Sequence, residues 1–265
     1  MKIGIMGVGA VGSAIKYGFE KLGHDVLGYD TADFETEFRD VLHTDICYIC
    51  VPTPKNEDGS CNVSIVDKCV RDLIAADYTG IIAIKSTVSP GTTQRFIDSF
   101  GERICFVPEF LRERCAITDF MESHDVCIIG TEDKEVFKAI RKSHGRYPNK
   151  VVQVSPTEAE MCKYFNNVYN ATLITFANSM FEVCEVLGAN YTAVKEAMTK
   201  RTHIFDRYLD CNDKTRGFGG VCLPKDTAAL DSLCKDLSID VELFKCLLTE
   251  NNKYETTVFE GMRKI

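Results

Sequence analysis

The sequence predicts an α/β fold in two parts, and two observations lead to it. Over residues 1–154, short apolar runs alternate with helical patterns, which is typical of a mostly parallel sheet covered by helices on both faces. From Ser155 a helical pattern continues without a break to Leu187, and only helical patterns follow it. We therefore expect a doubly wound sheet domain at 1–154, then a long helix and an all-helical domain within 155–265.

The apolar runs give the expected strands, and the periodic stretches give the expected helices. Strands are expected at 2–6, 25–30, 46–51, 81–85, 104–107, 126–130 and 151–154. Helices are expected from the first glycines to about 22, at 63–76, 92–100 and 134–142, and from 241 to about 259. Ser155 and Glu158 form a predicted capping box with Pro156 at the first helical position. A helix from there to Leu187 is about 48 Å long.

Three glycines and one acidic residue mark the start of the sheet domain. Gly7, Gly9 and Gly12 follow the first expected strand directly, and Asp30 ends the second. Glycines at this spacing allow a tight turn and the close approach of a pyrophosphate, which a helix N-terminus attracts. Asp30 would accept hydrogen bonds from ribose hydroxyls and repel a 2′-phosphate. The pattern predicts a Rossmann-type domain that binds NAD rather than NADP, and the alternative is a glycine-rich turn without a cofactor.

A second group of chemically informative residues lies at 217–226, with the sequence GFGGVCLPKD. Pro224 suits the first turn of a helix, so Cys222 is expected at that helix's N-terminus. The helix dipole and Lys225 both favour the thiolate form of such a cysteine. We expect Cys222 to be a nucleophile, and the alternative is a buried cysteine beside a glycine turn.

The bulk composition excludes several classes of protein. A net charge of −8 argues against nucleic acid as the main partner, and no segment approaches the length of a membrane span. The chain opens on a core strand, so no signal peptide is expected. Thirteen cysteines suggest a reducing cytoplasm. Cys47 and Cys50 lie on opposite faces of one expected strand, so they cannot share a metal, and no metal site is expected.

Five separated motifs occur in order along nearly the whole chain. They are residues 7–12 (GVGAVG), 51–54 (VPTP), 86–93 (STVSPGTT), 108–113 (PEFLRE) and the cysteine segment 217–226. The long helix adds a lysine and asparagine pair, Lys163 and Asn167. Together these motifs resemble the UDP-glucose and GDP-mannose 6-dehydrogenase family, and the fourth looks closer to the UDP-glucose branch than to the N-acetylamino-sugar dehydrogenases.

The resemblance implies an NAD-dependent enzyme that oxidises UDP-glucose to UDP-glucuronate in two hydride transfers, through a thiohemiacetal and a thioester on Cys222. The catalytic residues that it implies are Cys222, Lys163, Asn167, Asp226, Glu109 and Thr87. The implied cofactor-binding residues are Gly7, Gly9, Val11, Gly12, Asp30, Val51, Pro52, Thr53, Thr87, Glu113 and Lys225. The implied substrate-binding residues are Glu109, Phe110, Leu111, Arg112, Lys163, Asn167, Phe218, Gly219 and Cys222.

The resemblance also implies a homodimer that pairs through the long helix. One face of that helix carries apolar groups at helical spacing, which would be buried in the contact. These residues are Met161, Tyr164, Phe165, Val168 and Thr172. The alternative is that this face packs within its own chain.

The chain departs from the family pattern beyond Cys222. Full members carry a further α/β domain there that grips the nucleotide, so the resemblance implies a short form without this UDP-binding domain. Weak discrimination among nucleotides is then expected, because half of the usual cleft is missing. A partner copy is expected to cover apolar residues near the end, namely Leu243, Phe244, Leu247 and Leu248.

Two other functions stay open. A dehydrogenase of the β-hydroxyacid type would share the cofactor fold and the lysine and asparagine of the long helix, although a single oxidation needs no thiol. A non-catalytic remnant that binds cofactor or a partner is the third possibility, and the complete set of polar motif residues argues against it.

Overall fold

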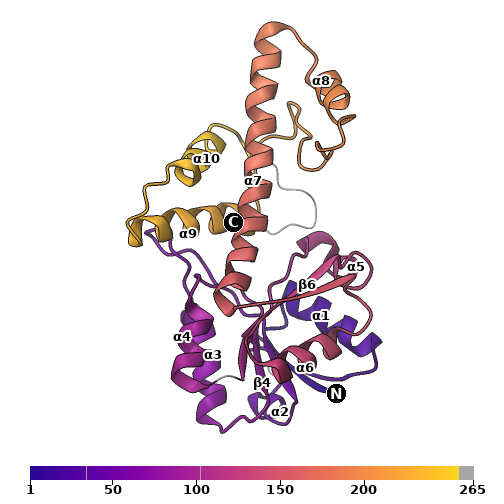
Figure 1. Ribbon diagram of the computed structural model, residues 1–265, viewed down its shortest axis with the longest axis vertical. Helices are drawn as coiled ribbons and strands as arrows, with labels where there is room; N and C mark the ends of the chain where they lie inside the picture. Colours follow the sequence, from indigo (N-terminus) through magenta and orange to yellow (C-terminus); the bar gives the residue numbers. More distant parts are fainter. Residues whose placement is uncertain (34, 102, 257–265) are drawn as a thin grey trace. The chain divides into compact units, whose positions relative to one another are not determined.

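A computed structural model of the protein describes residues 1–33, 35–101 and 103–256 (Figure 1). The chain forms two compact units. The first contains residues 1–54 and 61–163, and the second contains residues 55–60 and 164 to the end.

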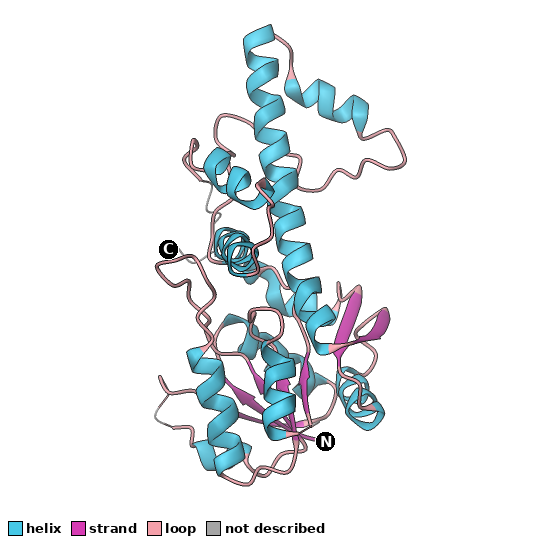
Figure 2. Ribbon diagram, turned by 60° about the vertical axis from the view of Figure 1, so that its left-hand side comes forward, coloured by secondary structure: helices cyan, strands magenta, loops and turns pink. Residues whose placement is uncertain are grey.

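A single sheet of seven strands forms the centre of the first unit (Figure 2). Its order is β2-β1-β3-β4-β5-β6-β7, and every neighbouring pair is parallel except β5 and β6, which meet at Phe106 and Gly130. The expectation of a mostly parallel sheet is therefore confirmed. The strands are β1 (Lys2–Met6), β2 (Asp25–Tyr29), β3 (Ile46–Ile49), β4 (Ile81–Ile84), β5 (Ile104–Phe106), β6 (Val126–Gly130) and β7 (Lys150–Val154).

Helices cover both faces of this sheet, because alternate strand residues point to opposite sides (Figure 1). In β3, Ile46 and Tyr48 join one apolar cluster while Cys47 and Ile49 join the other. Helices α1 (Ala10–Lys21), α5 (Ala116–Met121) and α6 (Lys134–His144) contribute to the first cluster. Helices α2 (Phe38–Val41), α3 (Ser64–Ala75) and α4 (Thr92–Phe100) contribute to the second.

The long helix, α7 (Pro156–Leu187), has the 32 residues that the sequence predicts. Its capping box is present, since the Ser155 amide donates to Glu158 at 2.8 Å and the Glu158 amide donates to the Ser155 hydroxyl at 3.3 Å. The helix ends at Gly188, whose φ of 66° is a left-handed conformation that glycine adopts without strain. The division between the two units falls within α7, after Lys163.

The second unit contains three further helices among the described residues: α8 (Tyr191–Met198), α9 (Cys222–Asp236) and α10 (Leu243–Asn251). Helices α9 and α10 pack together. The last helix is shorter than expected at both ends, and the expected part from 257 to 259 lies outside the described residues. Leu247 is only 5% exposed, so it is covered within this chain and the expectation that a partner copy covers it is wrong, whereas Leu243 is exposed.

The expected dimer face of α7 also needs correction. Tyr164 and Val168 are buried in this chain, so they belong to its own core. Phe165 is 74% exposed and Met161 is 40% exposed, and the exposed apolar stripe continues through Tyr169 and Phe176.

None of the helices within the described ranges is both long enough and apolar enough to cross a membrane.

Candidate active site

The first glycine turn connects β1 to α1 in a conformation that only small residues permit. Gly7 has a φ of 89°, and a Cβ there would lie 2.9 Å from the carbonyl of Cys50. A Cβ on Gly12 would lie 1.9 Å from the Gly7 oxygen, so α1 approaches the turn too closely for any side chain. The tight turn that the spacing predicts is present.

Gly9 is different, because it faces open space. It is the N-cap of α1, and apart from its own chain neighbours no described residue has an atom within 4 Å of the position where its Cβ would be. The space beside the first amides of the helix is therefore open at this position. Anions bind at such helix N-termini, so this end of α1 fits the pyrophosphate of a dinucleotide.

Asp30 follows β2 and lies beside the same turn. One carboxylate oxygen accepts a hydrogen bond from the Val8 amide at 2.7 Å, and the other accepts one from the Ala32 amide at 2.9 Å. A carboxylate has roughly four acceptor positions, so Asp30 keeps capacity for two ribose hydroxyls. The hydrogen bond to Val8 fixes the carboxylate at the glycine turn.

The residues after β3 and β4 lie at the same edge of the sheet, because the carboxyl ends of parallel strands meet there. The Ser86 hydroxyl donates to the Val51 carbonyl at 2.7 Å, which joins the two loops. Thr53 is buried, and the Thr87 carbonyl accepts a hydrogen bond from the Cys61 thiol at 3.4 Å. The structure therefore brings the VPTP segment and the start of the STVSPGTT segment together.

Lys163 and Glu109 form a nearly buried ion pair in the first unit. The ammonium lies 2.8 Å from the Glu109 carboxylate and 2.6 Å from the Glu109 carbonyl, with the two side chains 4% and 10% exposed. The other Glu109 oxygen accepts from the Leu111 amide at 2.7 Å. Lys163 also lies 5.8 Å from the centre of the Phe110 ring, which adds a cation–π contact. A solvated Lys163 is excluded by this geometry.

Arg112 makes a two-pronged contact with Asp119. Its guanidinium lies 2.6 and 3.0 Å from the two carboxylate oxygens, and its backbone amide donates to Asp119 as well. Burial alone would raise the pKa of Asp119, but the hydrogen bonds and charge of Arg112 lower it. Glu113 begins the short 3₁₀ helix Glu113–Cys115 that follows.

Sequence reasoning missed Glu160. This carboxylate is completely buried and accepts from the Gly91 amide at 2.6 Å and the Thr93 amide at 2.7 Å. It therefore caps α4 from the first turns of α7 and fixes the loop that contains Thr87. The only sequence signal was its position three residues before Lys163, on the same side of the helix.

A second polar group lies in the second unit. Asn167 donates to one oxygen of Asp226 at 2.6 Å, and both side chains are buried. The other Asp226 oxygen lies 2.7 Å from the Lys225 ammonium. That oxygen has no aligned hydrogen-bond donor in the described residues, so the ion pair at this distance is its main stabilisation. Lys163 and Asn167 lie one turn apart on α7, but each has its own carboxylate partner.

Cys222 is the first residue of α9 and is exposed. Pro224 lies in the first turn, as the sequence predicts, and Asp226 follows Cys222 by one turn. The preceding segment turns at Gly217 and Gly220, which have φ values of 59° and 72°. Phe218 is buried between them.

The core cysteines differ from Cys222 in their surroundings. Burial raises the pKa of Cys50 to about 12 and raises that of Cys47 further. Both thiols therefore stay protonated at neutral pH.

Two domains of one known protein family match this chain, in the same order as the motifs. Residues 31–146 match the NAD binding domain of the UDP-glucose/GDP-mannose dehydrogenase family, and residues 157–253 match its central domain. The chain belongs to this family. The glycine turn at residues 7–12 precedes the range that matches the NAD binding domain. Its geometry, described above, is that of a dinucleotide-binding turn.

Among similar proteins, UDP-glucose 6-dehydrogenase YwqF of Bacillus subtilis is 30% identical over 253 residues, which cover 92% of this chain and 57% of YwqF. The chain thus spans about half the length of the curated relatives that it matches. A UDP-glucose dehydrogenase from Pyrobaculum islandicum has a similar structure, with a TM-score of 0.85 and 27% identity over 95% of this chain and 68% of the other.

The fold is also shared with a smaller enzyme. The 3-hydroxyisobutyrate dehydrogenase of Mycobacterium tuberculosis has a TM-score of 0.77 and 17% identity, over 95% of this chain and 92% of its own. At this identity the likeness concerns the fold alone.

Proposed function

We propose that this family member is an NAD-dependent UDP-glucose 6-dehydrogenase that oxidises its substrate twice through a covalent bond to Cys222. The single observation that carries the proposal is the exposed Cys222 in the first turn of α9, with buried Asp226 one turn later. One oxidation of an alcohol needs no thiol, whereas oxidation of an aldehyde to an acid is made easier by a sulfur adduct. The complete cysteine segment therefore favours this activity over a β-hydroxyacid dehydrogenase.

When bound, NAD would supply the hydride acceptor for both oxidations. Gly7, Gly9, Val11 and Gly12 would hold its pyrophosphate at the N-terminus of α1, and Asp30 would bind the ribose. The open space at Gly9 supports this assignment. We propose further cofactor contacts from the loops after β3 and β4, from the start of the 3₁₀ helix and from the first turn of α9. The residues are Val51, Pro52, Thr53, Thr87, Glu113 and Lys225.

Cys222 forms the covalent bond. Its thiolate attacks the aldehyde carbon and forms a C–S bond, while the C=O π electrons move onto the carbonyl oxygen. That oxygen takes up a proton to give the thiohemiacetal. Loss of a second hydride and of the oxygen's proton gives a thioester. Water then attacks the thioester carbon, the C–S bond breaks, and the acid and the Cys222 thiol are released.

The Lys163 ammonium and the Asn167 side-chain amide would stabilise the reacting oxygen of the substrate at each stage. Lys163 and Asn167 donate from one side of α7 to the negative charge that develops there, as preorganised donors do in an oxyanion hole. Asp226 and Thr87 would position the water that accepts the first proton, and Glu109 would serve thioester hydrolysis. The ion pair between Lys163 and Glu109 supports their joint role.

The substrate-binding residues that we propose come from the family motifs in three segments of the sequence. These are Glu109, Phe110, Leu111 and Arg112 after β5, Lys163 and Asn167 on α7, and Phe218, Gly219 and Cys222 at the start of α9. We assign UDP as the nucleotide of the substrate because the similar proteins are UDP-glucose 6-dehydrogenases.

We further propose that two copies pair through α7. Phe165, Tyr169, Phe176 and Val183 are each more than half exposed, and their spacing places them along one stripe of the helix. The Phe165 and Tyr169 rings stack at 6.3 Å, which forms a ready apolar surface. A second copy of the same stripe would cover it. We also propose a reducing compartment such as the cytoplasm, because thirteen cysteines in a chain of this kind are typical of one.

Replacement of Cys222 tests the proposed function directly. Cys222→Ser should bind NAD and stay folded, yet it should form no UDP-glucuronate, because a serine hydroxyl is a weak nucleophile without a strong base. The measurement is the amount of acid formed with UDP-glucose and NAD, with Cys246→Ser on α10 as the matched exposed control. Normal conversion to the acid by Cys222→Ser would refute covalent catalysis.

A further inference from the structure

Two asparagines, which the catalytic proposal does not use, hold the segment that leads to Cys222. Asn251, the last residue of α10, is 5% exposed. Its side-chain oxygen accepts from the Phe218 amide at 2.6 Å, and its side-chain nitrogen donates to the Phe218 carbonyl at 2.9 Å. One side chain therefore pairs with both backbone groups of one residue, as a neighbouring strand would.

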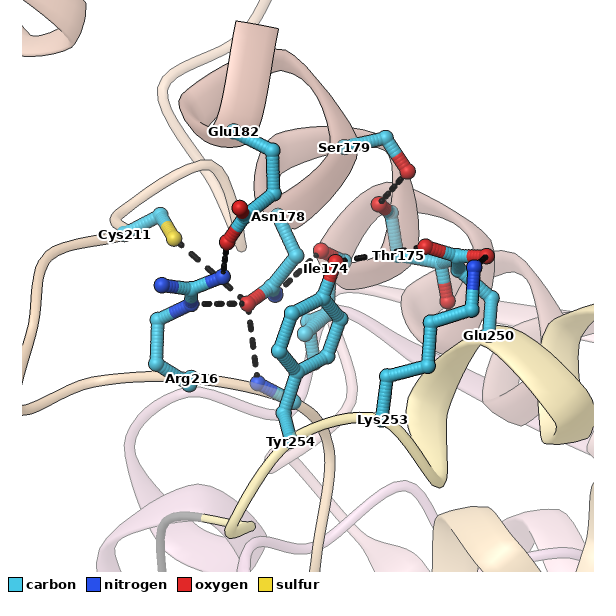
Figure 3. Close-up of polar contacts among 11 residues, drawn as sticks. Ile174, Thr175, Asn178, Ser179, Glu182, Cys211, Arg216, Glu250, Lys253 and Tyr254 are labelled. Atoms are coloured by element: carbon cyan, nitrogen blue, oxygen red, sulfur yellow. Dashed lines mark hydrogen bonds and ion pairs between the residues drawn. The ribbon is translucent and has the colours of Figure 1, made fainter. Parts of the chain in front are cut away.

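Asn178 on α7 holds the preceding residue. It is 1% exposed, and its side-chain oxygen accepts from the Gly217 amide at 3.1 Å and from Nε of Arg216 at 2.9 Å (Figure 3). The Cys211 thiol donates to the same oxygen at 3.5 Å. The Asn178 side-chain nitrogen donates to the Ile174 carbonyl at 2.8 Å, which fixes the amide's orientation.

Arg216 is held on several sides. Its guanidinium lies 4.8 Å from the Phe181 ring centre and 4.4 Å from the Tyr254 ring centre. It also pairs with Glu182, one turn from Asn178 on α7 (Figure 3). Tyr254 in turn donates to Glu250 at 3.2 Å, which ties the chain after α10 to the same place. These contacts attach Arg216, the residue before Gly217, to α7 and to the chain after α10.

The held segment is short, and Cys222 follows within five residues of Gly217. Between them, Gly219 and Gly220 carry no side chain to fix their course. A chain with glycines at this point depends on its anchored end for its direction. The hydrogen bonds at Gly217 and Phe218 therefore constrain the chain shortly before Cys222.

We propose that Asn251 and Asn178 are positioning residues that fix the glycine segment and thereby keep Cys222 at the N-terminus of α9. The inference rests on the proposed function only for its kinetic consequence. It makes α10 part of the machinery that prepares the thiol, although α10 carries no residue that reacts.

The first test measures the thiol without any substrate. Wild type, Asn251→Asp and Asn252→Asp are alkylated with iodoacetamide from pH 6 to 10, and modification of Cys222 and Cys246 is followed by peptide mass spectrometry. Asn251→Asp keeps an acceptor for the Phe218 amide but loses the donor to its carbonyl, so the segment loosens. Cys222 then leaves the helix terminus, and the inflection of its alkylation profile rises by about 0.5 pH unit.

Asn252→Asp is the matched control, because it adds the same charge at the exposed neighbouring position. Its Cys222 profile should equal that of wild type. Cys246, which is exposed on α10, is the internal reference and should keep its profile in all three proteins. Equal Cys222 profiles in Asn251→Asp and Asn252→Asp would overturn the proposal.

The second test separates position from binding. Asn178→Ala removes the shared acceptor from α7 while keeping a good helix former, and Ser179→Ala, its neighbour, loses only a bond within α7. We expect kcat with UDP-glucose to fall by about tenfold to a hundredfold in Asn178→Ala, because misplacement of the nucleophile acts on the chemical steps. KM should rise by a smaller factor than kcat falls, because Phe218 and Gly219 of the same segment are proposed to bind the substrate. Ser179→Ala should keep both constants.

The two tests distinguish the possible failures. If wild type does not oxidise UDP-glucose, the proposed function fails, while the alkylation profiles still decide whether the asparagines position Cys222. Asn178→Ala enters the alkylation assay too, so the inference stays testable if Asn251→Asp does not fold. An unchanged Cys222 profile in folded Asn178→Ala would contradict it.

Discussion

At the scale of single residues, Lys163 depends closely on Glu109. Its ammonium is almost fully buried, and Glu109 supplies both a carboxylate and a carbonyl to it. A buried cation that loses its partner charge is strongly disfavoured, so the two residues act as a unit.

Glu109→Gln tests this unit. We expect kcat to fall by about a hundredfold or more, because the variant can neither assist hydrolysis as a base nor balance the charge of Lys163. The measurement is the steady-state rate with UDP-glucose and NAD. Glu122→Gln, at an exposed position, is the control and should keep the wild-type rate. A Glu109→Gln variant with more than half of the wild-type kcat would show that Glu109 has no part in the reaction.

The sequence predicts residues of this kind when they belong to a recognisable segment, and it misses those defined by distant contacts. Cys222 and Asp226 lie within one glycine-rich segment, so both were found. Asn178 and Asn251 were missed, because their partners are backbone groups 39 and 33 residues away. Asparagine in a helix carries no signal of such a contact.

At the scale of elements, the start of α7 organises the loop before α4 through Glu160. Two backbone amides depend on this one carboxylate. Burial raises the pKa of Glu160, and the hydrogen bonds from Thr93 and Gly91 oppose that change.

Glu160→Gln should lower the free energy of unfolding by about 1–3 kcal/mol, because a glutamine offers one acceptor oxygen and turns an amide toward the second donor. Urea denaturation at pH 7.5 measures the change. Glu135→Gln on α6, whose side chain is 81% exposed, should change stability by less than about 0.5 kcal/mol. Equal urea midpoints for Glu160→Gln and Glu135→Gln would show that Glu160 does not stabilise the loop before α4.

A pair of histidines makes the first unit sensitive to acid. His124 and His144 lie with ring centres 5.9 Å apart, and the ring Nε2 of His144 has no hydrogen-bond partner among the described residues. Burial lowers the pKa of His124 to about 4 and lowers that of His144 well below its usual value, with the charge of Lys85 acting in the same direction.

Stability should therefore fall as the pH drops from about 6.5 to about 4. The unfolded histidines take up protons in this range while the folded ones do not, so protons favour the unfolded state. For His124 alone the loss is on the order of 3 kcal/mol. Urea unfolding of wild type and His124→Gln at pH 7.5, 6.5, 5.5 and 4.5 measures it. The variant should lose less stability than wild type, and equal losses would contradict the assignment.

The elements themselves were largely predictable, because β1 to β7 and α7 show long or regular apolar patterns. The sequence did not reveal α2 and α5, which have four and six residues. Helices this short have too few turns for their period to be recognised, and packing on the sheet determines them instead. The sequence predicts that the last helix ends near residue 259, but α10 ends at Asn251, whose side chain binds the backbone of Phe218.

For the whole molecule, the apolar stripe of α7 predicts self-association. Replacing Phe165 with glutamate would place a charge in the proposed contact, which costs more than the loss of apolar area alone. We expect wild type to sediment as a dimer at micromolar concentration and Phe165→Glu to sediment as a monomer. Lys68→Glu on α3, also exposed, is the control and should remain a dimer. A monomeric wild type would reject this interface.

The number of hydrides transferred tests the central claim most directly. Purified protein is supplied with excess NAD and a limiting amount of UDP-glucose, and the NADH formed is compared with the UDP-glucose consumed. Covalent catalysis through Cys222 predicts about two NADH for each UDP-glucose, with UDP-glucuronate as the product. A ratio of about one would indicate a single oxidation without need of the thiol, and no NADH would show that this chain does not catalyse the reaction.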